Sequence, residues 1–194
     1  MKLRQYRMPI VFCGLLGIFV LSVSLIDQLM QPTQTVQEVS QIVDRVSSTE
    51  VKEEVVISPV QGNEKIVRYF YEAGGTHNTE ALDYFEGVYR QSLGVDYGSD
   101  EAFNVFASLS GTVAEVKKDA ILGLCVTLEC ENGIRLIYQS LSNVGLEEGQ
   151  FINQGTIIGQ SGYNVYEAEL GNHVHFTIEK ENEPINPLSV IEKE

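Results

Sequence analysis

The sequence predicts a mainly antiparallel β fold, formed by one domain in the last two thirds of the chain. Short runs of β-branched and aromatic residues follow one another closely from residue 103 onward. Glycine-containing turns separate these runs, and no helical periodicity of useful length follows residue 92. The chain has 194 residues, which is enough for one globular domain and a modest appendage. We place the domain at residues 64–194.

The expected strands are spread along this whole domain. VRYFY (67–71) has strand composition, GGTHN (74–78) is a turn cluster, and ALDYFEGVYRQ (81–91) is aromatic and mixed. Asn132-Gly133 is a dipeptide that favours a tight turn, so it predicts a hairpin between the strands on either side. Six further runs have strand composition: FNVFASL (103–109), GTVAEVKK (111–118), LCVTLEC (124–130), IRLIYQSL (134–141), FINQGTIIGQ (151–160) and HVHFTIEK (173–180).

The N-terminus predicts a membrane anchor. Residues 1–7 contain three cations and form a short cytoplasmic tail, and residues 8–26 are apolar and uncharged. As a helix this run is about 28 Å long, the thickness of a hydrocarbon core, and the preceding cations orient the N-terminus toward the cytoplasm. A cleaved signal peptide would have a shorter apolar region and a small-residue cleavage site, and a soluble core helix would have a polar face. We therefore expect an uncleaved signal anchor.

The segment 27–63 predicts a polar spacer between the anchor and the domain. It is acidic and polar, and five of its residues recur at spacings of three and four, which favours a short amphipathic helix or a weak coiled coil. Such a helix is too short to be stable alone. The recurring residues are Val36, Val39, Ile42, Val43 and Val46.

Charge and cysteine content exclude several classes of protein. There are 27 acidic and 13 basic residues, a net charge of −14, which disfavours binding of the domain to nucleic acid or to anionic lipid. Three cysteines argue against a disulfide scaffold. Cys125 and Cys130 lie five residues apart in one expected strand, about 16 Å in extended chain, which is too far for a disulfide.

The sharpest local feature is the sequence His173-Val174-His175. On a strand the two imidazoles point to the same face, where they could share a metal ion or pair as ligand and acid–base group. The alternative is two ordinary histidines with satisfied polar atoms. The chain has only three histidines, and the third, His77, lies in a turn-rich segment where we expect it to be exposed.

Six segments occur in order between residues 88 and 188: SLGVDY (92–97), VFASLSGTV (105–113), YQSL (138–141), GQFINQGTIIGQSG (149–162), HVHF (173–176) and NPL (186–188). They resemble, in the same order, H-x-G-x-D-[YF], V-x-A-x-x-x-G-x-V, Y-x-H-L, G-x-x-V-x-x-G-x-x-I-G-x-x-G, H-x-H-F and N-P-x of the LytM or lysostaphin-type peptidoglycan endopeptidases. The resemblance covers nearly all of the β-rich region. It implies an antiparallel, LytM-type β-domain.

The resemblance also implies where a zinc site would lie. In that family the His and Asp of H-x-x-x-D and the second His of H-x-H bind zinc, and the other two motif histidines are catalytic. Carried over, Asp96 and His175 remain as vestigial ligands and His173 as a vestigial catalytic group. Ser92 replaces the third ligand, and Ser140 replaces the other catalytic histidine.

Loss of these two groups predicts a protein that is not an enzyme. A serine hydroxyl is a poor zinc ligand beside imidazole. Without zinc, a water molecule in the site keeps a pKa near its bulk value and is no nucleophile at neutral pH. We therefore expect no catalytic residue, no bound metal and no other cofactor, and a peptidase-like domain that serves as a binding module.

A closer resemblance is to the membrane-anchored, LytM-type sporulation proteins of endospore formers. It covers the layout of tail, anchor, spacer and terminal domain, and runs such as ASLSG (107–111) and IYQSL (137–141). It implies a single-pass protein of the forespore membrane whose domain lies between forespore and mother cell. It also implies a partner in the mother-cell membrane, a stage III sporulation protein AH-like protein, and a multimeric channel needed for engulfment and forespore development. The partner-binding residues stay unassigned.

Two other functions remain open at this point. One is a zinc-dependent peptidoglycan endopeptidase with a reorganised site built from Ser92, Asp96, His173 and His175. The other is a degenerate LytM domain that activates cell-wall amidases.

The charge distribution around the apolar run makes a prediction about topology. Protease added to protoplasts should remove the C-terminal domain and leave a short membrane-embedded fragment, because the N-terminus is expected in the cytoplasm. Immunoblotting with antibodies to each end measures this. A fully protected domain would contradict the orientation, and a soluble secreted product would contradict the uncleaved anchor.

Overall fold

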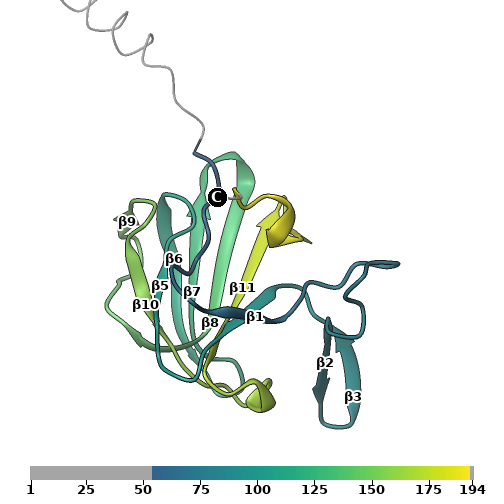
Figure 1. Ribbon diagram of the computed structural model, residues 1–194. Coiled ribbons are helices and arrows are strands. Elements are labelled where there is room, and N and C mark those ends of the chain that lie inside the picture. Colours follow the sequence, from purple (N-terminus) through teal and green to yellow (C-terminus); the bar gives the residue numbers. More distant parts are fainter. Residues whose placement is uncertain (1–53, 193–194) are drawn as a thin grey trace, which may run out of the picture. The chain divides into compact units, whose positions relative to one another are not determined.

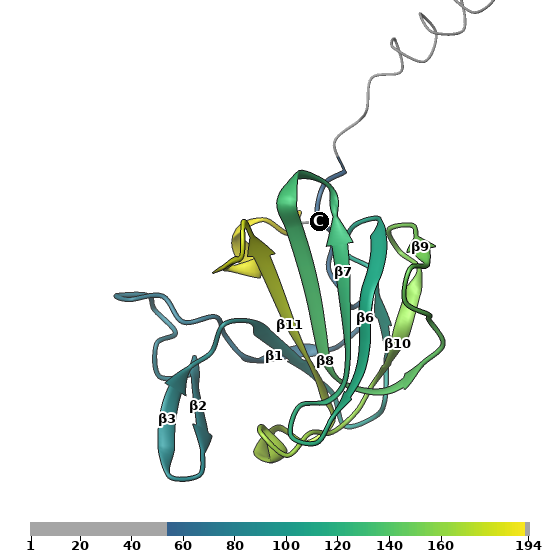
Figure 2. The same cartoon turned by 180° about the vertical axis from the view of Figure 1, so that it is seen from behind.

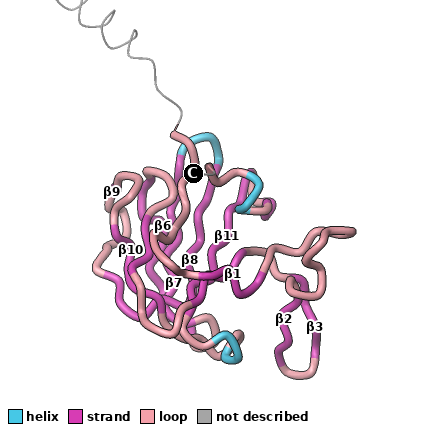
Figure 3. The backbone as a smooth tube through the Cα atoms, in the orientation of Figure 1, coloured by secondary structure: helices cyan, strands magenta, loops and turns pink. Residues whose placement is uncertain are grey.

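One large antiparallel sheet organises the structure (Figure 1). The computed structural model describes residues 54–192. Within them, ten strands join the large sheet, two form a separate hairpin, and all strand pairs are antiparallel. Helix in this part of the chain is confined to three short 3-10 turns (Figure 3). The prediction of a mainly antiparallel β fold is confirmed.

The elements are numbered in chain order. The large sheet contains β1 (Lys65–Arg68), β4 (Val95–Gly98), β5 (Asn104–Phe106), β6 (Gly111–Asp119), β7 (Gly123–Cys130), β8 (Ile134–Val144), β9 (Phe151–Ile152), β10 (Ile157–Ser161), β11 (His173–Lys180) and β12 (Glu183–Ile185). The hairpin contains β2 (Leu82–Phe85) and β3 (Val88–Gln91). The 3-10 turns are η1 (Glu131–Gly133), η2 (Ala168–Leu170) and η3 (Pro187–Ser189).

Strand β8 forms the centre of the sheet. The strand order is β1-β4-β11-β8-β7-β6-β9, and β8 also pairs with β10, which in turn pairs with β5. Tyr138 of β8 lies opposite Phe176 of β11, and their rings are 5.0 Å apart. The Tyr138 hydroxyl accepts a hydrogen bond from the Ser108 amide at 3.0 Å, which ties β8 to the β5–β6 connection.

The hydrophobic core lies on one face of this sheet. Alternate residues of a strand point to opposite faces, so β7 and β11 contribute every second side chain to the core along their buried parts. β6 contributes only Val113 to the buried core, because its register shifts after that residue. The buried apolar residues of the core are Val56, Val60, Val95, Tyr97, Phe103, Val105, Ala107, Leu109, Val113, Val126, Leu128, Leu136, Tyr138, Leu141, Ile152, Ile158, Val174, Phe176 and Ile178.

The hairpin β2–β3 lies to one side of the large sheet in both views (Figure 2). Its turn contains Glu86 and Gly87, both with positive φ, and Tyr84 faces Tyr89 across it with both side chains exposed. Phe85 contacts Tyr166 of the segment between β10 and β11, with ring centroids 5.1 Å apart. The hairpin is therefore attached to the segment that precedes β11.

Several expected elements are confirmed, and others differ in detail. The Asn132-Gly133 hairpin joins β7 to β8, and both residues have positive φ (57° and 69°), as a tight hairpin turn requires. The expected run 151–160 is two strands, because Gly155 adopts φ 77° in a turn between β9 and β10. The sequence does not predict β4 (Val95–Gly98) as a strand, because four residues are too few to show an alternation of apolar and polar side chains.

The segment before Glu64 packs against the domain. Val56 and Val60 belong to the core, although the sequence places residues 27–63 in the spacer. The amide of Ile57 donates to the Ser108 carbonyl at 3.1 Å, and the Phe106 amide donates to the Pro59 carbonyl at 2.8 Å. The run VVISPV (55–60) is a short apolar stretch within a segment that is otherwise polar and acidic, so composition alone does not reveal this packing. The folded unit therefore begins N-terminal of residue 64.

The predicted tail (1–7), the anchor (8–26) and most of the spacer lie outside the described residues, so these expectations stay predictions. Between residues 54 and 192, no helix has the length and apolar character needed to cross a bilayer.

Packing of the N-terminal segment predicts a measurable contribution to stability. Val56→Ala and Val60→Ala should each lower the free energy of unfolding by about 1–3 kcal/mol, because each deletes buried methyl groups and leaves a cavity. Val55→Ala is the matched control, since Val55 is half exposed. Urea unfolding of the three variants measures the effect. Equal midpoints for Val55→Ala and Val60→Ala would contradict the packing role.

Candidate functional site

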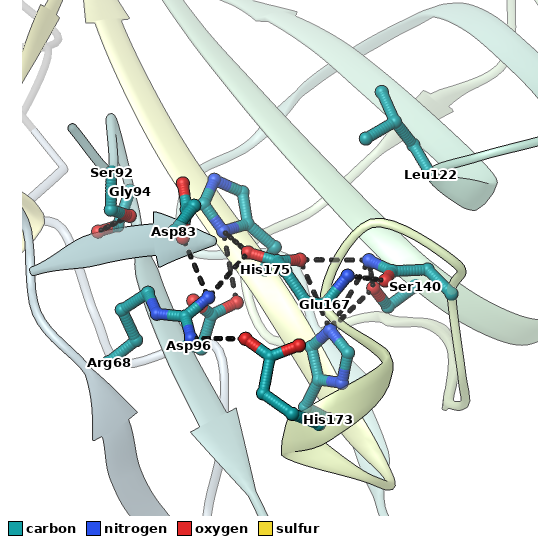
Figure 4. Close-up of polar contacts among 12 residues, drawn as sticks. Arg68, Asp83, Ser92, Gly94, Asp96, Leu122, Ser140, Glu167, His173 and His175 are labelled. Atoms are coloured by element: carbon teal, nitrogen blue, oxygen red, sulfur yellow. Dashed lines mark hydrogen bonds and ion pairs between the residues drawn. The ribbon is translucent and has the colours of Figure 1, made fainter. Parts of the chain in front are cut away.

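Strand pairing brings the predicted site residues together. β11 lies between β4 and β8, and His175 is in register with Asp96 on one side and Gln139 on the other. Ser140 follows Gln139, and its hydroxyl is 2.8 Å from His173 Nε2. Figure 4 shows these side chains converging from three strands. The two histidines share one face of β11, as their spacing predicts.

His175 is held by two carboxylates and a hydroxyl. Its Nδ1 lies 2.9 Å from Asp96 Oδ1 and 3.3 Å from Glu167 Oε1, and its Nε2 lies 3.2 Å from Thr177 Oγ1. Burial disfavours the imidazolium form, but the charges of Asp96 and Glu167 outweigh burial, and the pKa of His175 is raised well above its ordinary value. The two carboxylates therefore favour the imidazolium form of His175.

His173 is completely buried, with both ring nitrogens engaged. Its Nδ1 lies 2.8 Å from the Gly171 carbonyl, so Nδ1 carries a proton. Its Nε2 lies 2.8 Å from Ser140 Oγ and 3.3 Å from Glu167 Oε2. Burial lowers the pKa of His173, but the hydrogen bonds to Glu167 and to the Gly171 carbonyl raise it by more than burial lowers it. The net effect is a raised pKa.

Glu167 lies between the two imidazoles and is buried. Its backbone amide donates to Asn164 Oδ1 at 2.6 Å, and Asn164 Nδ2 donates to its Oε2 at 2.8 Å. Burial alone would raise the pKa of this carboxyl group, but its bonds to His173, His175 and Asn164 hold the pKa well below its ordinary value. Glu167 is therefore an ionised carboxylate inside the protein.

Arg68 completes the cluster from the opposite side (Figure 4). It is buried, and its Nη1 lies 2.6 Å from Asp83 Oδ1 and 3.6 Å from Glu167 Oε1. Its Nη2 lies 2.7 Å from Glu169 Oε1. Burial and the nearby Glu167 charge raise the pKa of Asp83 to about 6, in spite of Arg68. Arg68 thus joins β1, the hairpin and η2 through charged contacts.

Ser92, at the position of the missing ligand, makes a local contact instead. It is buried, and its hydroxyl donates to the Gly94 carbonyl at 3.2 Å. Gly94 lies against the site, because a side chain there would begin 2.6 Å from His175 Nε2. His77 is exposed, as expected, and pairs with Glu80 rather than with the cluster.

The cluster does not fit zinc in the manner that the resemblance implies. Asp96, Glu167 and His173 each offer a ligand atom, and these atoms lie within 4.8 Å of one another. Within the described residues, Asp96 Oδ2 is buried without a hydrogen-bond partner, and Glu167 Oε1 has only the ion-pair contacts with His175 and Arg68. However, these ligands are two carboxylates and one histidine, whereas the zinc site implied by the resemblance has one carboxylate and two histidines. The Arg68 guanidinium, 3.6 Å from Glu167, also opposes the binding of a second cation.

Four residues of this cluster are missing from the sequence-based expectations. Glu167 and Asn164 lie in an irregular segment that matches no motif, and Asp83 lies in the mixed segment 81–91. Arg68 offers the one usable signal, because it is a charged residue within a strand-like run. If such a residue is buried, it must be paired with an opposite charge. Its partners cannot be inferred from spacing.

A family model for peptidase family M23 matches residues 90–187 of this chain. Stage II sporulation protein Q of Bacillus subtilis (strain 168) is 40% identical over 146 residues, which cover 72% of this chain and 52% of that protein. The chain thus spans about half the length of this curated relative.

Solved structures agree with this relationship. The SpoIIQ-SpoIIIAH pore forming complex contains a chain 40% identical to this one, with a TM-score of 0.69, and the match covers 72% of this chain and 92% of that chain. A zinc containing peptidase from Vibrio cholerae is 21% identical with a TM-score of 0.58, over 70% of this chain and 40% of that chain. The second likeness concerns the fold alone.

The contacts of Ser140 predict a structural role for the residue that replaces a histidine. Ser140→Ala should lower the free energy of unfolding by about 1–3 kcal/mol, because it removes the hydroxyl that contacts His173 and Asn164 in a buried site. Ser99→Ala, at an exposed position, is the control. Denaturant unfolding compares the two, and equal stability would argue against this role.

Proposed function

This chain belongs to peptidase family M23, and from that premise we propose that it is an inactive member that serves as a membrane-anchored scaffold in endospore formation. The proposed domain layout is a cytoplasmic tail (1–7), a signal anchor (8–26), a spacer that ends before the packing of Val56, and a peptidase-like domain. The proposed location is the forespore membrane, with the domain in the space between forespore and mother cell.

The residues at the metal and catalytic positions support the absence of catalysis. Asp96 and His175 are proposed as vestigial ligands and His173 as a vestigial catalytic group, with Ser92 and Ser140 as the replacements. Asp96 Oδ1 and His175 pair with each other, and the Ser92 hydroxyl is bound to Gly94, so these three side chains do not present the three ligands of the family's zinc site. A hydrolytic zinc site needs three protein ligands and a bound water.

The observation that carries the binding role is the relationship to stage II sporulation protein Q. This chain is 40% identical to that protein and covers 92% of the related chain in the SpoIIQ-SpoIIIAH pore forming complex. We infer that a SpoIIIAH-like protein of the mother-cell membrane is the partner of this chain. The two proteins would form a multimeric channel across the intermembrane space that is needed for engulfment and forespore development.

Charge supports a polar, salt-sensitive association. The whole chain has a net charge of −14, so a partner surface with excess Lys and Arg would be attracted to the domain. Attraction of this kind raises the association rate at low ionic strength and weakens as salt increases.

Direct binding without zinc tests this function. Calorimetry of residues 53–194 with the soluble domain of a SpoIIIAH-like protein should give a dissociation constant of about 10 μM or tighter, about −7 kcal/mol, with a chelator present. Added salt should slow association, and an amidase in place of the partner is the control. No heat and no co-elution would end the proposal, and binding only to the amidase would favour the activator function.

A further inference from the structure

The carboxylate of Glu167 fills the space between the two imidazoles of the site. Its Oε2 lies 3.3 Å from His173 Nε2 and its Oε1 lies 3.3 Å from His175 Nδ1. We propose that Glu167, backed by Arg68, excludes zinc from this site by an internal ion-pair network, so that the loss of metal binding does not rest on Ser92 and Ser140 alone.

Glu167 is held in this position by its own segment of chain. Asn164 binds it at both ends, through the Glu167 amide and through Oε2. The segment is fixed at its base, where the amides of Gly162 and His173 donate to each other's carbonyls, and where the Val165 amide donates to Ile121 at 2.8 Å. The carboxylate therefore points into the site without needing a metal to order it.

Arg68 adds positive charge beside the same carboxylate. Its guanidinium lies between Asp83 and Glu167 and is anchored on its other side by Glu169. The register of β1 with β4 places Arg68 opposite Asp96, the remaining ligand position. A divalent cation bound to Asp96 and His175 would lie close to this fixed charge and would be repelled by it.

Two of the donors that zinc would need are already used. Asp96 Oδ1 and His175 Nδ1 bind each other at 2.9 Å. Zinc ligands lie about 2.0–2.2 Å from the ion, so in a tetrahedral site two ligand atoms are about 3.4 Å apart. An ion bound by Asp96 Oδ1 and His175 Nδ1 would therefore break the hydrogen bond between them. The ion would also compete with Glu167 for His175 Nδ1, because Glu167 Oε1 lies 3.3 Å from that atom.

Restoring the two histidines should therefore be insufficient to restore zinc binding. The test uses the full-length chain in detergent and measures zinc affinity by competition with a chromogenic chelator. The double variant Ser92→His with Ser140→His is compared with triple variants that add Glu167→Ala or Glu167→Gln. Glu169→Ala, added to the same double variant, is the matched control, because Glu169 also binds Arg68 but contacts neither histidine. Thermal melting of each variant shows that it is folded.

The double variant and the Glu169 control should bind zinc weakly, and a folded triple variant without the Glu167 carboxylate should bind one equivalent at least about 10-fold more tightly. The glutamine variant keeps the shape of Glu167 without its charge, and it serves as the test if the alanine variant does not fold. Equal affinity of double and triple variants would overturn the proposal. Zinc binding by the unmodified chain that is lost in Glu167→Ala would also overturn it, because Glu167 would then be a ligand.

Discussion

The structure depends on the position of β11 between β4 and β8. Alternation along β11 directs Val174, Phe176 and Ile178 into the apolar core and leaves His173, His175 and Thr177 on the opposite face. That second face is also buried, so its polar side chains need partners inside the protein. Asp96, Ser140 and Glu167 supply them. The sheet therefore carries an apolar layer on one side and a charged, buried layer on the other.

The charged layer behaves as a set whose members require one another. Removing one partner of a buried ion pair typically costs about 3–5 kcal/mol, because the other charge is left unpaired. Loss of His173 or His175 would remove one of the two imidazoles that pair with Glu167, and loss of Glu167 would leave His173 without its carboxylate partner. This dependence gives a physical reason for two histidines to be present in a domain whose neighbouring motif positions hold serines.

The sequence predicts the fold and those members of the charged cluster that occupy motif positions, because both have local signals in the chain. Strand composition, Asn132-Gly133 and the order of motifs are local signals, and they correctly indicate the antiparallel sheet and the hairpin between β7 and β8. Asp96, His173 and His175 are identified because they occupy motif positions. Glu167 and Arg68 reach the site through the path of an irregular segment and the pairing of β1 with β4, and neither property has a local signature. The packing of Val56 and Val60 is missed for the same reason, since it depends on contacts of their segment with residues 106–108, far along the chain.

The N-terminal segment has a mechanical consequence. The Glu192 amide donates to the Val56 carbonyl at 2.9 Å, so the folded unit begins and ends at the same place on its surface. Figure 1 shows the C-terminus beside the start of the described chain. Tension applied through the preceding residues would load this bond and the backbone bonds of Ile57 and Pro59 before those of the large sheet. β11 and the strands paired with it would be loaded only after this segment had detached, so force applied at the N-terminal end of the described chain would act first at the edge of the domain.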